Sequence, residues 1–150
     1  MDIHFNHSES VDAPAETLFG VITDYAGYPR FNPAVVEMTV VAKDQNGAEF
    51  VAKRKTRIAK QVRAFDCYER NENLTIKRTY GPKSKAQSTW TIHRVDASHS
   101  TLTIDAATTM PLLPGLVMKP LLRRLFYGIN FDPFIREAQR RANATRSQMG

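Results

Sequence analysis

The residues that could do chemistry in this chain are charged side chains set among apolar ones. Arg54, Arg78 and Arg94 fall in phase with apolar neighbours, in runs where every second residue shares one face. Glu9 occupies the same kind of position near the N-terminus. An unpaired charge in an apolar interior costs on the order of several kcal/mol, so each arginine must extend to water, pair with Glu9 or Asp66, or face a bound molecule. Two interpretations follow: a structural one, in which the arginines reach the surface or form internal ion pairs, or a site for the polar head of an apolar ligand.

The sequence contains no motif of a common catalytic or metal site. A nucleophile elbow, a phosphate-binding loop, zinc-ligand spacing and a motif of paired carboxylates are all absent. His4 and His7 stand three residues apart in a strand-like run, which places them on opposite faces. A single cysteine, Cys67, excludes an internal disulfide. We therefore expect no catalytic residue of a standard class, no metal and no cofactor.

Length and charge limit the remaining classes. The chain has 150 residues, of which 42% are hydrophobic, so we expect residues 1–150 to form one domain with its own core. No run of about 18 apolar residues and no signal-peptide pattern occurs, so we expect a soluble, cytoplasmic protein. The net charge of +6 indicates affinity for an anionic partner, such as a membrane surface or RNA.

Most of the excess positive charge lies in two clusters. Each falls within an amphipathic element, which is typical of a solvated face as well as of a binding surface. The clusters are Lys53, Arg54, Lys55, Arg57, Lys60 and Arg63, and Arg123, Arg124, Arg136, Arg140, Arg141 and Arg146.

Alternating apolar and polar residues predict seven strands, at residues 3–11, 34–43, 47–57, 60–70, 73–80, 85–96 and 100–110. Asn46-Gly47 is a strong hairpin signal, and the other connections between successive strands from residue 34 onward are equally short. Short connections join antiparallel neighbours. On the last strand, Leu102, Ile104 and Ala106 share the face that we expect to be buried, opposite Thr103 and Asp105.

Helical spacing occurs at both ends of the chain. Pro14 begins a helix whose apolar stripe is Ala15, Leu18, Phe19 and Ile22, and residues 25–31 form at most a second short helix. Near the C-terminus, Pro133 interrupts a long amphipathic segment, which predicts one kinked helix or two collinear ones. Its apolar stripes are Met118, Leu121, Leu122, Leu125 and Ile129, and Phe131, Phe134, Ile135, Ala138 and Ala142.

These residues resemble a known superfamily over nearly the whole chain. The resemblance rests on two groups of residues: Val11-Asp12-Ala13-Pro14-Ala15-Glu16, Leu18-Phe19, Asp24, Tyr28-Pro29, Phe31 and Pro33; and Gly81, Ser88-Thr89-Trp90, Thr103 and Ala138-Gln139-Arg140-Arg141-Ala142. The pattern is similar to that of START-like (helix-grip, SRPBCC) proteins of the polyketide cyclase/dehydrase and coenzyme Q-binding type. This resemblance implies an α+β helix-grip fold, with a seven-stranded antiparallel sheet wrapped around a long C-terminal helix and a cavity between them.

The resemblance also indicates which residues we expect to bind a ligand. A cavity of this kind takes lipids, quinones, sterols or polyketides, and the inward-phase residues of adjacent elements would form its wall. We expect the ligand-binding residues to be Phe50, Arg54, Ile76, Arg78, Tyr80, Trp90, Ile92, Ile104 and Leu125.

Three functions remain open at this point. The protein could carry a hydrophobic small molecule without catalysis, which the missing motifs favour. It could be a polyketide aromatase/cyclase in which Arg78, Tyr80 and Trp90 hold and polarise carbonyls. It could associate with RNA or the ribosome, in the manner of toxin-like members of the superfamily, through its basic surface. We expect no DNA partner, and either a monomer or a homodimer.

Overall fold

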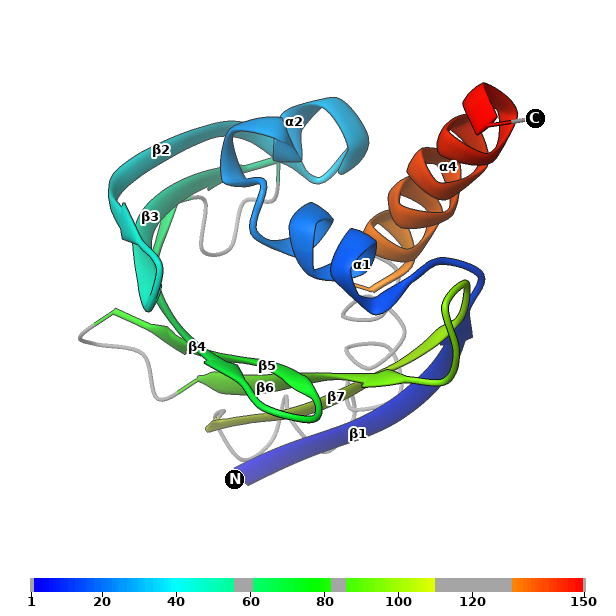
Figure 1. The fold of residues 1–150 in the computed structure, drawn as a ribbon. Helices are drawn as coiled ribbons and strands as arrows, with labels where there is room; N and C mark the ends of the chain where they lie inside the picture. The colour runs from blue at the N-terminus through cyan, green and yellow to red at the C-terminus, as the bar shows by residue number, and fades with distance from the viewer. Residues whose placement is uncertain (1, 56–60, 82–85, 110–130, 150) are drawn as a thin grey trace.

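The computed structural model describes residues 2–55, 61–81, 86–109 and 131–149 (Figure 1). The elements are β1 (Asp2–Val11), α1 (Ala15–Ile22), the 3-10 helix η1 (Tyr25–Gly27), α2 (Tyr28–Phe31), β2 (Val35–Asp44), β3 (Gly47–Arg54), β4 (Gln61–Arg70), β5 (Leu74–Tyr80), β6 (Gln87–Arg94), β7 (Ser100–Thr109) and α4 (Asp132–Met149). The predicted strands are confirmed within a few residues at each end. The chain has the expected helix-grip α+β fold.

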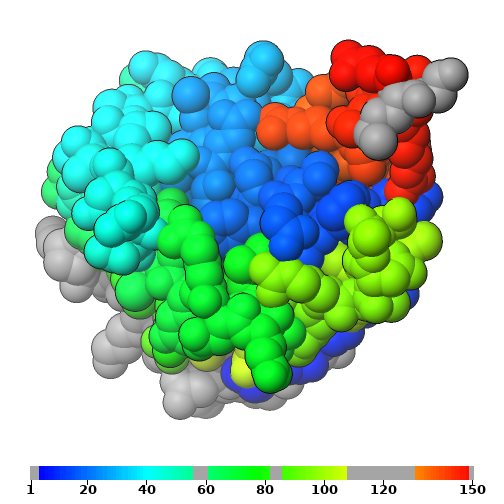
Figure 2. Space-filling model, in the orientation of Figure 1, coloured from blue at the N-terminus to red at the C-terminus, as the bar shows by residue number. Residues whose placement is uncertain are grey.

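The strands form one antiparallel sheet of seven strands in the order β1-β7-β6-β5-β4-β3-β2. The first strand therefore pairs with the last, and every other neighbour follows in sequence. The sheet is strongly curved, and α1 and α4 lie on its concave side (Figure 1). In the space-filling view, α1 and the residues after it fill the opening of the curved sheet (Figure 2). The concave face of the sheet is therefore the face that the helices cover.

The β2–β3 hairpin forms where Asn46-Gly47 predicted it. The Asp44 carboxylate accepts hydrogen bonds from the backbone N–H groups of Asn46 and Gly47, at 2.7 and 3.1 Å. Gly47 also lies directly against the neighbouring strand, because a Cβ at this position would stand 2.1 Å from the backbone oxygen of Asp66. The turn therefore requires glycine for reasons of space.

The core lies between the concave face of the sheet and the helices. On β7, Leu102, Ile104 and Ala106 are buried, whereas Thr103 is half-buried and Asp105 is exposed, as the alternation predicted. On α1, the buried residues are Ala15, Leu18, Val21 and Ile22. The predicted place of Phe19 in this stripe is wrong, because Phe19 lies at the margin of the core, with its ring against Tyr68.

The second C-terminal stripe is confirmed in α4. Its apolar positions are all buried, and Pro133 stands in the first turn, where a missing N–H breaks no helical hydrogen bond. The buried residues are Phe131, Phe134, Ile135, Ala138 and Ala142. The first stripe, from Met118 to Ile129, lies outside the described residues, and so does the join between the two stripes that would distinguish one kinked helix from two collinear ones.

None of the helices in the described part of the chain is both long and apolar enough to cross a membrane.

Candidate ligand site

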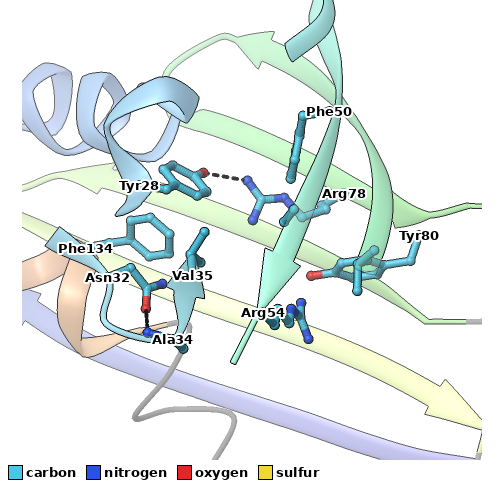
Figure 3. A pocket seen from close by; sticks show the side chains of 11 residues that line it. Tyr28, Asn32, Ala34, Val35, Phe50, Arg54, Arg78, Tyr80 and Phe134 are labelled. Atoms are coloured by element: carbon cyan, nitrogen blue, oxygen red, sulfur yellow. Dashed lines mark hydrogen bonds between the residues drawn. The ribbon is translucent and has the colours of Figure 1, made fainter. Parts of the chain in front are cut away.

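A pocket opens between the α2–β2 segment, strands β3, β4 and β5, and the start of α4 (Figure 3). Its volume is about 30 Å³, which is room for a few water molecules or one functional group of a larger molecule. The lining residues are Tyr28, Asn32, Ala34, Val35, Phe50, Ala52, Arg54, Val62, Arg78, Tyr80 and Phe134.

The chemical centre of this region is a buried ion pair. The antiparallel register places Asp66 of β4 opposite Arg78 of β5, so their side chains are cross-strand neighbours on the concave face. Nε of Arg78 donates to one carboxylate oxygen at 2.7 Å, and Nη2 donates to the other at 2.9 Å. The side chains of Arg78 and Asp66 are 4% and 0% exposed. The first interpretation from the sequence, an internal pair between Arg78 and Asp66, is therefore confirmed.

Three tyrosines complete the polar cluster. Nη2 of Arg78 also donates to the hydroxyl of Tyr28 at 3.0 Å, and that hydroxyl donates to the backbone carbonyl of Ile22. The Tyr25 hydroxyl donates to Asp66 at 2.6 Å and lies 2.5 Å from the Tyr68 hydroxyl. The turn after α1 thus supplies two phenols that fix the ion pair from the helix side.

Aromatic rings enclose the guanidinium of Arg78. Its Cζ lies 5.0 Å from the centre of the Phe50 ring and 5.2 Å from that of the Trp90 ring, distances at which a cation is attracted to a ring face. Phe134 of α4 packs edge-on against Trp90, with ring centres 5.3 Å apart. The guanidinium therefore has little freedom to rotate or to leave the pocket.

The surroundings keep the cluster in one protonation state. Burial raises the pKa of Tyr25 and of Tyr28 well above the ordinary value for a phenol, and the nearby Asp66 carboxylate raises both further. Burial alone would lower the pKa of Arg78, but the attraction of Asp66 raises it well above the usual arginine value. At neutral pH the phenols are protonated and the guanidinium is charged.

Two hydrogen-bond donors beside the pocket, one on Arg78 and one on Tyr80, have no acceptor among the described residues. Every side-chain hydrogen bond that Arg78 makes to the described residues is donated by Nε or Nη2, and none of them is donated by Nη1. The Tyr80 hydroxyl likewise has no hydrogen-bond partner in the described part of the chain, and it points into the same pocket (Figure 3). A buried donor without an acceptor is costly, so an oxygen atom of water or of a ligand fits this position.

The structure brings together four of the residues expected from the sequence. Phe50, Arg54, Arg78 and Tyr80 all line the pocket. Four others are fully buried in the adjacent core without lining it: Ile76, Trp90, Ile92 and Ile104. Leu125 lies outside the described residues.

Other inward-phase charges lie elsewhere. Glu9 is exposed, His7 is half-buried, and Arg94 is exposed with its Nε bonded to Glu16 of α1 at 2.8 Å. The alternation of the sequence assigns these residues to the correct face of the sheet. They lie near the margin of that face, however, and not over the buried core. The expectation that Glu9 and Arg94 belong to the buried polar set is therefore wrong.

The sequence reasoning missed Tyr25, Tyr28, Asn32 and Phe134 as site residues. Asn32 is buried, and its side-chain oxygen accepts from the backbone N–H of Ala34 at 3.1 Å, which shapes the pocket rim. Tyr28 belongs to the aromatic-proline turn that carried the family resemblance. This turn was therefore the feature of the sequence that could have identified Tyr28 as a site residue.

Comparison with known proteins agrees with this architecture. Residues 2–142 match the family described as polyketide cyclase / dehydrase and lipid transport. The chain belongs to this family. No curated protein matches the sequence.

Solved structures of this fold resemble the chain at low sequence identity. The aromatase/cyclase Zhui from Streptomyces sp. R1128 is 15% identical with a TM-score of 0.72, over 97% of this chain and 98% of that chain. Human STARD10 is 15% identical with a TM-score of 0.72, over 99% and 67%. Norcoclaurine synthase from Thalictrum flavum is 10% identical with a TM-score of 0.69, over 94% and 96%. These likenesses support the fold.

Proposed function

We propose that this protein binds a hydrophobic small molecule, such as a lipid, quinone or polyketide, and holds one polar group of that molecule at Arg78. The observation that carries the proposal is the guanidinium of Arg78, which is buried, fixed by Asp66 and two aromatic rings, and lines a pocket; its Nη1 donates to none of the described residues. The family, which includes lipid transport, supports it.

The size of the pocket limits what it holds. Sites for whole drug-sized ligands enclose roughly 300–1,000 Å³. The pocket at Arg78, at about 30 Å³, therefore takes one end of the ligand. The apolar lining residues, Phe50, Ala52 and Phe134, would contact the carbon atoms next to that end.

The basic surface supports a nucleic-acid function less well. Many of its cations already have acidic partners: Lys53 lies 3.1 Å from Glu37, Arg140 lies 2.6 Å from Glu137, and Arg146 lies 3.3 Å from Asp12. Paired cations contribute less to the attraction of phosphates than free ones. We therefore place the RNA- or ribosome-binding function behind ligand binding.

A second candidate function is that of an aromatase/cyclase. The buried Arg78 would polarise a ketone, and the Tyr80 hydroxyl would donate a hydrogen bond to a second oxygen in the same pocket. The test is to incubate the protein with a poly-ketone of the kind that aromatase/cyclases convert and to follow the aromatic product by ultraviolet absorbance. Product formation by the wild-type protein that is lost in a folded Arg78→Gln variant would support catalysis. If the wild-type protein leaves the poly-ketone unchanged, catalysis is contradicted and only the binding function stands.

The binding proposal is tested by filling the pocket. Ala52→Trp places an indole on the pocket face of β3, and Val51→Trp places the same indole on the opposite face of the same strand. Binding of the fluorescent apolar probe phenyl-naphthylamine should weaken by about tenfold or more in Ala52→Trp and by less than about twofold in Val51→Trp. Equal affinities in the two variants would contradict the site.

A further inference from the structure

We infer that the buried end of this pocket selects an uncharged oxygen, such as a ketone or quinone carbonyl, over a carboxylate or phosphate. The inference rests on the proposed ligand site and names the chemical class that Arg78 would accept. An arginine in a lipid-binding pocket would ordinarily suggest an acidic head group, but the contacts of this arginine indicate the opposite.

The charge of Arg78 is already neutralised. Asp66 holds the guanidinium through two hydrogen bonds of 2.7 and 2.9 Å, and the carboxylate is fully buried. A ligand carboxylate at Nη1 would bring a second anion close to Asp66, with only one cation between them. It would also lose its hydration shell on entering the buried end.

Among the described residues, the neighbouring phenols and the nearest lysine are already engaged and would not compensate a second anion. The hydroxyl of Tyr28 donates to the backbone carbonyl of Ile22, and that of Tyr25 donates to Asp66, so both phenolic hydrogens are engaged. Lys43 is exposed, and its Nζ donates to the carbonyl of Thr23 at 2.9 Å. Nη1 of Arg78 and the hydroxyl of Tyr80 donate to no acceptor in the described part of the chain, and together they suit the lone pairs of a carbonyl oxygen.

A second cation lies at the rim. Arg54 lines the pocket, is half-exposed, and has no acidic partner among the described residues. An anionic group of a ligand would therefore be accommodated at Arg54, in contact with water, while the uncharged oxygen occupies the position at Arg78. The two arginines of this site have separate roles because, among the described residues, Arg78 has an acidic partner and Arg54 has none.

Matched probes test this selection. Acetylnaphthalene and naphthoate share one ring system and differ in a ketone against a carboxylate that is ionised at about pH 8. Trp90 is the single tryptophan and lies against Arg78, so its fluorescence reports occupancy. The wild-type protein should bind acetylnaphthalene at least about tenfold more tightly than naphthoate, with isothermal calorimetry as a second measurement.

Variants separate the two arginines. Asp66→Asn removes the buried negative charge with little change of shape, so the preference should shift toward naphthoate by about tenfold or more. Asp105→Asn, an exposed acid of β7, is the matched control and should leave the preference unchanged. Because Asp66→Asn could fail to fold, Arg54→Gln is the second variant: it should weaken naphthoate binding by about tenfold more than acetylnaphthalene binding.

Each outcome decides the inference. Equal or tighter wild-type binding of naphthoate, unaffected by Arg54→Gln, would overturn it. If neither naphthalene probe binds while phenyl-naphthylamine does, the selection for a carbonyl is wrong and the proposed binding function stands. If phenyl-naphthylamine also fails to bind, the proposed function itself is wrong.

Discussion

At the scale of single residues, the Arg78–Asp66 pair links stability to function. Both partners are buried, and each satisfies the other in a geometry that the β4–β5 register enforces. Such a pair need not stabilise the fold relative to an apolar pair, because both charges lose their hydration when they are buried. The position of Arg78 in the lining of the pocket is consistent with the proposed role in recognition.

Removing one partner of this pair should be far more damaging than removing both. We expect Asp66→Ala to lower the free energy of unfolding by about 3–5 kcal/mol, since Arg78 would remain as an uncompensated buried charge. The double variant Asp66→Leu/Arg78→Met should recover most of that loss while it abolishes binding of acetylnaphthalene. Urea denaturation measures the first effect and calorimetry the second. Additive losses in the double variant would contradict this coupling.

The buried phenols predict a loss of stability at high pH. The pKa of Tyr28 is raised in the folded protein, chiefly by burial, so the folded state favours the protonated phenol. This contribution to stability is fully present below the unfolded phenol pKa of about 10 and decreases as the pH rises above it. Urea denaturation between about pH 9 and 11 should show this decrease. In Tyr28→Phe the decrease should be smaller, and an identical pH dependence would contradict the assignment.

At the scale of elements, glycine requirements differ between a hairpin and a helix. Gly47→Ala would place its Cβ 2.1 Å from the backbone oxygen of Asp66, so strand β4 would have to move. Gly20 in α1 is exposed with nothing within 4 Å of an added Cβ. We expect Gly47→Ala to destabilise by about 1–3 kcal/mol and Gly20→Ala to stabilise by about 0.5–1 kcal/mol. Thermal unfolding of the two variants checks this contrast in sign.

The edge strand β2 shows how this sheet avoids pairing with another sheet. Its register with β3 shifts between Val35 and Glu37 and again between Val40 and Ala42. The shifts leave Val36 and Val41 exposed, at 54% and 47%. Bulges of this kind twist an edge and interrupt the regular row of hydrogen-bonding groups that another strand would need. The exposed valines of β2 are therefore no evidence for a docking surface.

At the scale of the whole molecule, the charge of +6 and the pocket should act independently. Binding of phenyl-naphthylamine buries apolar surface, so its affinity should change by less than about twofold between roughly 0.05 and 0.5 M salt. Association with RNA through the basic clusters would instead weaken steeply over that range. Fluorescence titrations at several salt concentrations measure this dependence. A steep loss of probe affinity with salt would mean that the probe binds the charged surface and not the pocket.

Much of the fold was determined by the sequence alone. The period-two runs fixed the strands, Asn46-Gly47 fixed one hairpin, and the spacing from Phe131 to Ala142 fixed the buried face of α4. These features depend on neighbours within a few residues, which is why local patterns predict them. The order of the elements, together with the aromatic-proline turn, was sufficient for the family.

The tertiary structure decided which polar residues form the site. Periodicity places Arg54, Arg78 and Arg94 on one kind of face, but it does not state how far along the curved sheet each one lies or what covers it. Arg78 is buried because the register sets it opposite Asp66 and because the turn after α1 brings Tyr25 and Tyr28 over the pair. Arg94 lies at the end of β6, where its side chain is exposed and pairs with Glu16 at the surface. Contacts between segments 40 to 50 residues apart depend on the packing of the whole chain, and no local pattern encodes them.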